Sequence, residues 1–314
     1  TESSNPSSLF EYNNVLYFAA SDPNGDCELW QYTEGNVPER VADINTGSSS
    51  SNPDNFVILN NILYFTVTTS STGREIFYYN GTGSPQLLYD INSGTASSNP
   101  IYLTVFDNKL YFSASENTNG TELWVYDGQN NPTLFYNIAP STSSSEPTNS
   151  KVIGRKLYFS ANDQTNGKEI WVYDGVNNPY IYVDVYAGVK SSNPTTFTQY
   201  NNMIYFAAET HPYGKELMRT CFSINDTITQ TACESFNFEG TDYTSTGLYT
   251  ISQTSPLGCD ISYTLDLTIE NSNFNINQNE NIITVNADNA TYQWLDCNNS
   301  YAIIPGETNA TFVA

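Results

Sequence analysis

An apolar triplet that occurs five times at a fixed interval constrains the fold of this chain more than any other feature. The copies read Leu-Tyr-Phe or Ile-Tyr-Phe, lie 47 residues apart, and begin at Leu16, Leu63, Leu110, Leu157 and Ile204. A Glu-Leu-Trp-like triplet keeps the same register from Glu28 onward, and a proline does so from Pro6 onward. Because self-similarity at such a period marks a repeat architecture, the first two-thirds of the chain is predicted to be an array of like units.

Within one period, residues 98–144, the pattern predicts four short strands. They cover 101–106, 109–114, 122–126 and 134–138. The pairs Asp107-Asn108 and Asp127-Gly128 separate runs of aromatic and β-branched residues, which is typical of hairpin turns because Asn, Asp and Gly tolerate positive φ. No segment of the array shows the spacing of an amphipathic helix. Each unit is therefore predicted to be a four-stranded antiparallel meander in an all-β protein.

The length of the unit favours the blade of a β-propeller over the coil of a parallel β-helix, which is usually shorter. Four units are complete, near 4–50, 51–97, 98–144 and 145–191. A fifth begins at Ser192 and keeps three strands to Met218. The prediction is four blades and a partial fifth, or a five-bladed ring whose last strand is irregular or supplied from elsewhere.

The register is lost after residue 220, and two further modules are expected. The first domain is residues 1–220, the propeller. Residues 221–270 form a small β module that contains a disulfide, with an alternating strand near Leu265. Residues 271–314 form part of an immunoglobulin-like module in which Trp294 is the buried tryptophan, and the chain is expected to end inside or just after it.

Five cysteines suggest two disulfides and one unpaired thiol. A Cys233–Cys259 bridge is expected to staple the small module. A Cys27–Cys221 bridge is hypothesised as a clasp, because a closed ring would make the first and fifth units neighbours. No Cys-x-x-Cys pattern is present and His211 is the sole histidine, so a Cys/His zinc site is excluded. Cys297 is left over, with a partner expected beyond residue 314.

Ten Lys and Arg against thirty-three Asp and Glu give a net charge of −23, which argues against nucleic acid or anionic lipid as a partner. Charged residues are only 14% of the chain, and Asn, Ser, Thr and Tyr dominate its polar surface. That composition is typical of extracellular proteins. No apolar run is long enough to insert into a membrane, and no signal peptide is visible at Thr1, so we expect a segment of a longer polypeptide or surface assembly.

The segments Glu122 to Gly128 and Glu169 to Gly175, with Asp-Ile-Asn and Ser-Ser-Asn-Pro nearby, resemble the hyalin-like ELWxxDGT-repeat proteins. These are large secreted or surface proteins of bacteria, and the likeness covers residues 3–218. The later segments around Cys233 and Trp294 are similar to adhesin-type and immunoglobulin-like modules of secreted proteins of Bacteroidota. The resemblance implies type IX secretion, a cell-surface location, no established catalytic residues and O-glycosylation at Thr227.

Several residue patterns allow a chemical and a structural interpretation. The repeated Glu28, Glu75, Glu122, Glu169 and Glu216 could form a ring of carboxylates, or each could start a strand beside a turn, which we favour because five like charges repel. The Asp-x-Asn-x-Gly turns suggest Ca²⁺ as the one possible cofactor, and turn hydrogen bonding is the favoured alternative. The candidate ligands are Asp43, Asn45, Asp90 and Asn92.

Aromatic residues, 14% of the chain, could stack on sugar rings or form the blade core, and the core is favoured for those at repeat positions. His211 replaces a turn residue, so a catalytic role is disfavoured. We therefore predict a non-catalytic secreted or cell-surface structural and adhesive protein that binds an extracellular surface, glycan or protein ligand. The alternative is a carbohydrate-binding or accessory module of an extracellular polysaccharide-degrading system, and an enzyme proper ranks third.

Overall fold

The structure, a computed structural model, contains only β-strands and connecting segments in its described residues. These residues are 3–201, 203–221, 225–233, 235–238, 240–254, 260–270, 274–287, 291–296, 298 and 302–313. The chain divides into two compact units, Thr1–Phe222 and Ser223–Ala314. No helix in the described part of the chain has the length and apolar character that crossing a membrane requires.

The first unit is a series of antiparallel meanders of the propeller-blade type, as the 47-residue repeat predicts. Blade one contains β1 (Ser7–Tyr12), β2 (Val15–Ser21), β3 (Cys27–Tyr32) and β4 (Glu39–Arg40). Blade two contains β5 (Asp54–Leu59), β6 (Ile62–Thr69), β7 (Gly73–Tyr79) and β8 (Gln86–Leu87). Blade three contains β9 (Ile101–Phe106), β10 (Lys109–Glu116), β11 (Gly120–Tyr126) and β12 (Thr133–Tyr136). Blade four contains β13 (Thr148–Ile153), β14 (Lys156–Asn162), β15 (Lys168–Tyr173) and β16 (Tyr180–Val183). Blade five contains β17 (Thr195–Tyr200), β18 (Met203–Thr210) and β19 (Gly214–Cys221).

The first hairpin of each blade follows from its turn residues. In blade three, Asp107 and Asn108 both have positive φ, 47° and 55°, and Phe106 pairs directly with Lys109. Two central residues with positive φ define the tight turn whose twist matches that of the flanking strands. The predicted hairpin is confirmed here, and the bounds of all four strands of residues 98–144 lie within two residues of the predicted ones.

A β-bulge in the first strand of every blade was not predicted. The pairing register shifts in β1, β5, β9, β13 and β17. The second residue of each of these strands has a positive φ, and these residues are Ser8, Asn55, Tyr102, Asn149 and Thr196. Because this position carries no constant residue type, the sequence offers no signal for the bulge, which bends and twists the strand locally.

The core lies between consecutive blades rather than inside any one of them. Tyr12, Tyr17 and Leu29 of blade one form a single buried cluster with Leu63 and Phe65 of blade two. The corresponding residues join blade two to blade three and blade three to blade four. First strands also contact in sequence order, β1 with β5, β5 with β9, β9 with β13 and β13 with β17. Each blade therefore depends on a neighbour for burial of its apolar faces.

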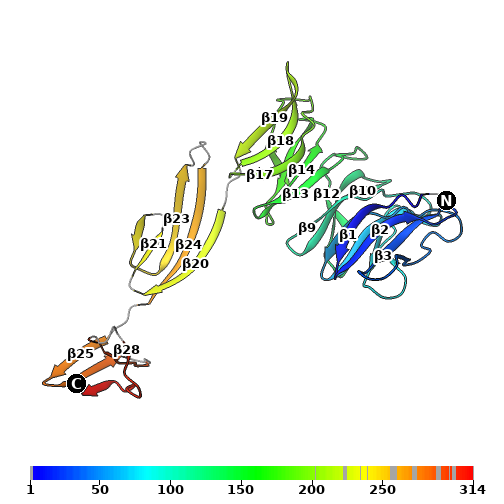
Figure 1. Cartoon of the computed structure of the whole chain (residues 1–314). Helices are drawn as coiled ribbons and strands as arrows, with labels where there is room; N and C mark the ends of the chain where they lie inside the picture. The colour runs from blue at the N-terminus through cyan, green and yellow to red at the C-terminus, as the bar shows by residue number, and fades with distance from the viewer. Residues whose placement is uncertain are drawn as a thin grey trace. The chain divides into compact units, whose positions relative to one another are not determined.

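The blades form a row whose two ends do not meet. Figure 1 shows β1–β3 at one end of this unit and β17–β19 at the other. Cys27 has a free thiol, so the hypothesised Cys27–Cys221 clasp is wrong. The physical reason is the open row, because the clasp required the first and fifth blades to be neighbours.

The second unit contains several small sheets. Its strands are β20 (Asn225–Cys233), β21 (Phe236–Phe238), β22 (Thr241–Tyr243), β23 (Gly247–Thr254), β24 (Asp260–Glu270), β25 (Phe274–Asn279), β26 (Ile282–Ala287), β27 (Leu295–Asp296), β28 (Ala302–Ile303) and β29 (Thr311–Val313). The order β20-β24-β23 places β24 at the centre of one sheet, and its Leu265, Leu267 and Ile269 form the buried core there. Trp294 stacks on Phe312 with ring centroids 5.1 Å apart.

The expected Cys233–Cys259 bridge is also wrong, because Cys233 is an exposed free thiol. β20 runs parallel to β24, and Cys233 pairs with Glu270 at the far end of that strand. Asp260 begins β24, ten residues before Glu270, which corresponds to about 33 Å of extended chain. Cys259, which precedes Asp260 in the sequence, lies outside the described residues.

Candidate functional site

Four of the five repeated glutamates hold successive blades together. Glu122 is fully buried and accepts four hydrogen bonds from donors that lie after its own blade's third strand. Its Oε1 accepts from the backbone nitrogens of Ala139 at 3.2 Å and Ser145 at 3.0 Å, and its Oε2 accepts from the nitrogen of Ile138 at 2.9 Å and from Ser145 Oγ at 2.6 Å. The carboxylate thus fixes the segment that leads into the next blade.

The same arrangement recurs at three further junctions. Serine Oγ donates to the buried carboxylate in the pairs Ser51–Glu28, Ser98–Glu75 and Ser192–Glu169. Each of these serines is itself fully buried and opens the Ser-x-Pro motif of the next repeat. We call each pair a glutamate–serine clamp. The interpretation of the repeated glutamates as strand-starting structural residues fits this geometry.

Burial raises the pKa of the clamp glutamates above the usual value of 4.5, and the hydrogen bonds from serine and backbone partly oppose that rise. The residues are Glu28, Glu75, Glu122 and Glu169. Desolvation is the largest cause at all four, since a buried carboxylate loses water that three or four protein donors only partly replace.

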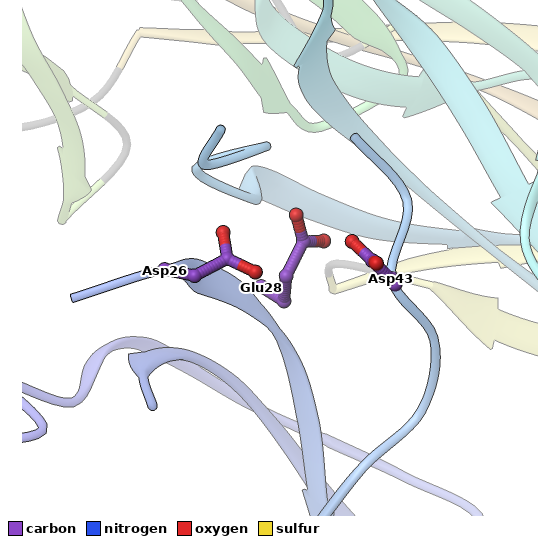
Figure 2. A group of neighbouring side chains, drawn as sticks. All are labelled: Asp26, Glu28 and Asp43. Carbon is purple, nitrogen blue, oxygen red and sulfur yellow. The ribbon is translucent and has the colours of Figure 1, made fainter. Parts of the chain in front are cut away.

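One junction carries additional acids. Figure 2 shows Asp26, Glu28 and Asp43 with their carboxylates directed toward one another, and one oxygen of each lies within 4.8 Å of the others. Asp26 and Glu28 are buried, whereas Asp43 is exposed. Asp26 stands where the other four blades have Gly73, Gly120, Gly167 and Gly214, so among the described residues this acid cluster belongs to blade one.

The acid cluster is partly neutralised by a neighbouring cation. Arg40 Nη1 lies 3.1 Å from Asp26 Oδ2, while the buried Asp26 Oδ1 has no hydrogen-bond partner. Burial raises the pKa of Asp26, the negative charge of Asp43 raises it further, and Arg40 lowers it. Glu28 already accepts four hydrogen bonds from Ile44, Asn45 and Ser51. The cluster could hold a hard cation only with Arg40 displaced, since carboxylate oxygens are the ligands that Ca²⁺ prefers.

The predicted Ca²⁺ ligands are engaged mostly in turn hydrogen bonds. Asp43 Oδ2 accepts from the nitrogen of Gly47 at 3.3 Å, and Asp90 Oδ2 accepts from that of Gly94 at 2.9 Å. Asn45 donates to the Ser50 carbonyl and accepts from Ser70, and Asn92 donates to the Ser97 carbonyl. The structure thus brings Asp43 to Asp26 and Glu28 rather than to Asn45, and cation binding stays a prediction.

Residues of blade one line an apolar cavity of about 410 Å³. Its apolar lining includes Leu9, Leu16, Phe18, Trp30 and Tyr32. Leu9 is 62% exposed, and Leu16, Trp30 and Tyr32 are partly exposed.

The other residues singled out from the sequence lie outside the clamps, the acid cluster and the aromatic cavity. Thr227, the glycosylation candidate, lies within β20, and its modification stays a prediction. His211 lies in the turn between β18 and β19, with its ring 6.3 Å from that of Tyr186. The sequence interpretation missed the acid cluster, although the replacement of a repeat glycine by Asp26 was a visible signal. It also missed the clamps, which the constant Ser-x-Pro motif could have suggested.

No family model matches the chain, and no curated protein matches it. Among solved structures, the chain is similar to the computationally designed Ika8 protein, with 15% identity over 92% of this chain and 70% of that chain and a TM-score of 0.40. It is also similar to the β-propeller domain of the Trilobed protease from Pyrococcus furiosus, with 12% identity over 70% and 67% of the two chains and a TM-score of 0.42. The BP39L lectin from Burkholderia pseudomallei gives 9% identity over 69% and 66% and a TM-score of 0.41. At these identities and scores, no function follows for this chain.

Proposed function

We propose that this chain is a non-catalytic structural and adhesive protein of the cell exterior, which works by binding through exposed apolar faces. The observation that carries this proposal is the pair of uncovered faces at the two ends of the blade row. Leu217 in β19 is 75% exposed, and the aromatic cavity of blade one is open to solvent. Exposed apolar patches of this kind mark interaction sites in soluble proteins.

The repeated acids support a structural role. The four clamp glutamates have all their described hydrogen bonds inside the protein and are fully buried, so they serve the junctions between blades rather than a reaction. The polar composition and the small number of charged residues support a location outside the cell.

Adhesion and location are tested separately. Beads coated with the chain are expected to attach to polysaccharide-coated or protein-coated surfaces under flow, with beads carrying denatured chain as the control. Antibody against the chain is expected to label intact cells of the source or their medium. Labelling confined to the cytosolic fraction would contradict the exterior location, and attachment no better than the denatured control would contradict adhesion.

Binding of a carbohydrate is a second candidate function, favoured by the aromatic lining of the cavity. Trp30, Phe18 and Tyr32 provide apolar ring surface of the type that packs against sugar rings. A glycan array with and without Ca²⁺ tests this candidate. Saturable binding to one polysaccharide that Trp30→Ala abolishes would favour it, and loss of that binding on Ca²⁺ removal would assign a role to the acid cluster.

A further inference from the structure

Every junction in the row joins the same two surfaces. The leading face of a blade, defined in blade one by Tyr12, Tyr17 and Leu29, packs on the trailing face of the next blade. In blade one the trailing face is defined by the positions of Leu9, Leu16, Phe18, Trp30 and Tyr32. In blade two the equivalent positions Phe56, Leu63, Phe65, Phe77 and Tyr79 all pack in the cluster shared with the leading face of blade one. The blade row therefore has one type of interface, used repeatedly.

Among the described residues of the first unit, no blade packs against the trailing face of blade one. Leu16 is partly exposed, whereas its equivalents Leu63, Leu110, Leu157 and Ile204 are fully buried. Leu9 is 62% exposed, whereas its equivalent Phe197 in blade five is 5% exposed. The aromatic cavity is thus the surface that a preceding blade covers at every other junction.

The leading face of blade five is uncovered in the same way. Leu217 is 75% exposed, whereas its equivalents Leu29, Ile76, Leu123 and Ile170 are at most 1% exposed. Tyr200 is 63% exposed, whereas its equivalents Tyr12, Leu59, Phe106 and Ile153 are at most 8% exposed.

The two ends of the blade row also carry the two polar residues of a clamp, one residue at each end. Glu216, the fifth repeated glutamate, is exposed, and Ser4, which opens the first Ser-x-Pro motif, is exposed as well. At the four internal junctions the equivalent serine donates to the equivalent glutamate. The two ends therefore carry complementary halves of one clamp, together with complementary apolar faces.

We propose that the chain assembles head to tail: the leading face of blade five of one copy docks on the trailing face of blade one of a second copy, and Ser4 of that copy donates to Glu216. The proposal rests on the proposed adhesive function and names its partner. A second copy is the occupant because both free faces repeat the residues and the clamp of an interface that the chain already forms internally. Since the two faces differ, the contact is heterologous and can continue into longer oligomers.

Complementary face variants of the full chain test the proposal. Leu9→Arg places a charge on the trailing face, and Leu217→Arg places one on the leading face. Both leucines are largely exposed, so neither change disturbs the buried core. Val176→Arg, at an 86% exposed turn residue away from both faces, is the matched control. Circular dichroism and thermal melting are the checks that all three variants are folded.

Sedimentation velocity over about 1 to 100 µM chain is expected to show concentration-dependent oligomers for the unchanged chain and for Val176→Arg. Each face variant alone is expected to associate at least about 30-fold more weakly, as for loss of a central interface residue. An equimolar mixture of the two is expected to form dimers and nothing larger, since only one intact face of each kind remains.

Three results would overturn the proposal. One is an unchanged chain that stays monomeric over the whole concentration range. That result is expected if a single chain closes on itself or if a different partner occupies the two faces. Another is persistence of oligomers in either face variant. The third is failure of the mixture to form dimers. If monomeric chain still attaches beads to a polysaccharide-coated surface, the adhesive function is supported although the assembly is not. Failure of the assembly and failure of the adhesive function are therefore distinguishable.

Discussion

At the residue scale, the repeated glutamate decides how the blades are held together. It provides two oxygens at a point where the following segment presents two or three backbone nitrogens and a serine hydroxyl. A carboxylate is the side chain that only accepts hydrogen bonds, so it matches a set of donors better than any neutral residue of its size. The cost is burial of a charge, which shows in the raised pKa of Glu122.

Glu122→Gln is expected to lower the free energy of unfolding by about 1–3 kcal/mol, because the amide nitrogen of Gln would face backbone or serine donors and leave them unsatisfied. Glu216→Gln is the matched control and should have almost no effect in the monomer, since Glu216 is exposed. Urea denaturation followed by tryptophan fluorescence measures both. A Glu122→Gln variant as stable as the unchanged chain would show that relief from charge burial outweighs the lost acceptors.

The pH dependence follows from the sign of the glutamate pKa shifts. Four clamp glutamates have a pKa above 4.5 in the folded state, so the folded chain binds protons more readily than the unfolded chain. Their contribution to stability is complete below pH 4.5 and is lost as the pH rises through the folded pKa. Turn hydrogen bonds lower the pKa of Asp127 and Asp174 to about 2. Their contribution to stability is complete above pH 3.8 and is lost as the pH falls from there through the folded pKa of about 2.

The free energy of unfolding is therefore expected to rise as the pH falls from neutral toward 4.5, and to fall again below 3.8. Urea midpoints measured at several pH values in dilute solution check this, and Glu122→Gln should reduce the rise. A steady loss of stability between neutral pH and 4.5 would show that the hydrogen bonds to the carboxylates dominate over burial.

At the element scale, the glycine that begins the third strand of the inner blades is required by a close approach. Gly120 has a φ of +69°, and a Cβ there would lie 2.7 Å from the carbonyl oxygen of Ser143. That carbonyl belongs to the segment entering blade four. Gly214 in blade five has a similar φ of +80°, but a Cβ there would meet no atom within 4 Å. Blade five thus has the same glycine turn before its third strand, but among the described residues no neighbouring segment packs against Gly214 as Ser143 packs against Gly120.

Gly120→Ala and Gly214→Ala are expected to separate backbone strain from crowding. Both variants carry the cost of a non-glycine residue at positive φ, about 1 kcal/mol. Gly120→Ala should cost more, because the serine backbone must also move. Thermal melting of both variants measures the difference, and equal losses would mean that the neighbouring segment yields freely.

At the scale of the whole molecule, the net charge opposes the association of two chains, whereas the exposed apolar faces at the ends of the blade row favour it. Each chain carries a net charge of −23, so two chains repel before their faces meet. The proposed contact is largely apolar and is not weakened by salt. Screening therefore helps association, in contrast to an interface held by ion pairs.

Head-to-tail association is expected to strengthen when NaCl rises from about 0.02 M to 0.3 M, because the screening length shortens from roughly 20 Å to below 10 Å. Sedimentation velocity of the unchanged chain at fixed concentration measures the shift toward oligomers. Weaker association at the higher salt concentration would indicate an interface dominated by opposite charges instead.

The sequence by itself determined the features that depend on local chain chemistry. The 47-residue period, the strands of residues 98–144 and the hairpin at Asp107-Asn108 follow from the alternation of apolar residues and from turn residues that tolerate positive φ. Only the tertiary structure decided what the repeats do to one another. The clamp joins residues 23 positions apart, such as Glu122 and Ser145, and the acid cluster joins Asp26 to Asp43. The cysteine pairings were wrong for the same reason, because a partner across the fold depends on whether the row closes and on which strand lies beside which. Contacts of that kind follow from the packing of whole blades and sheets, which no local pattern specifies.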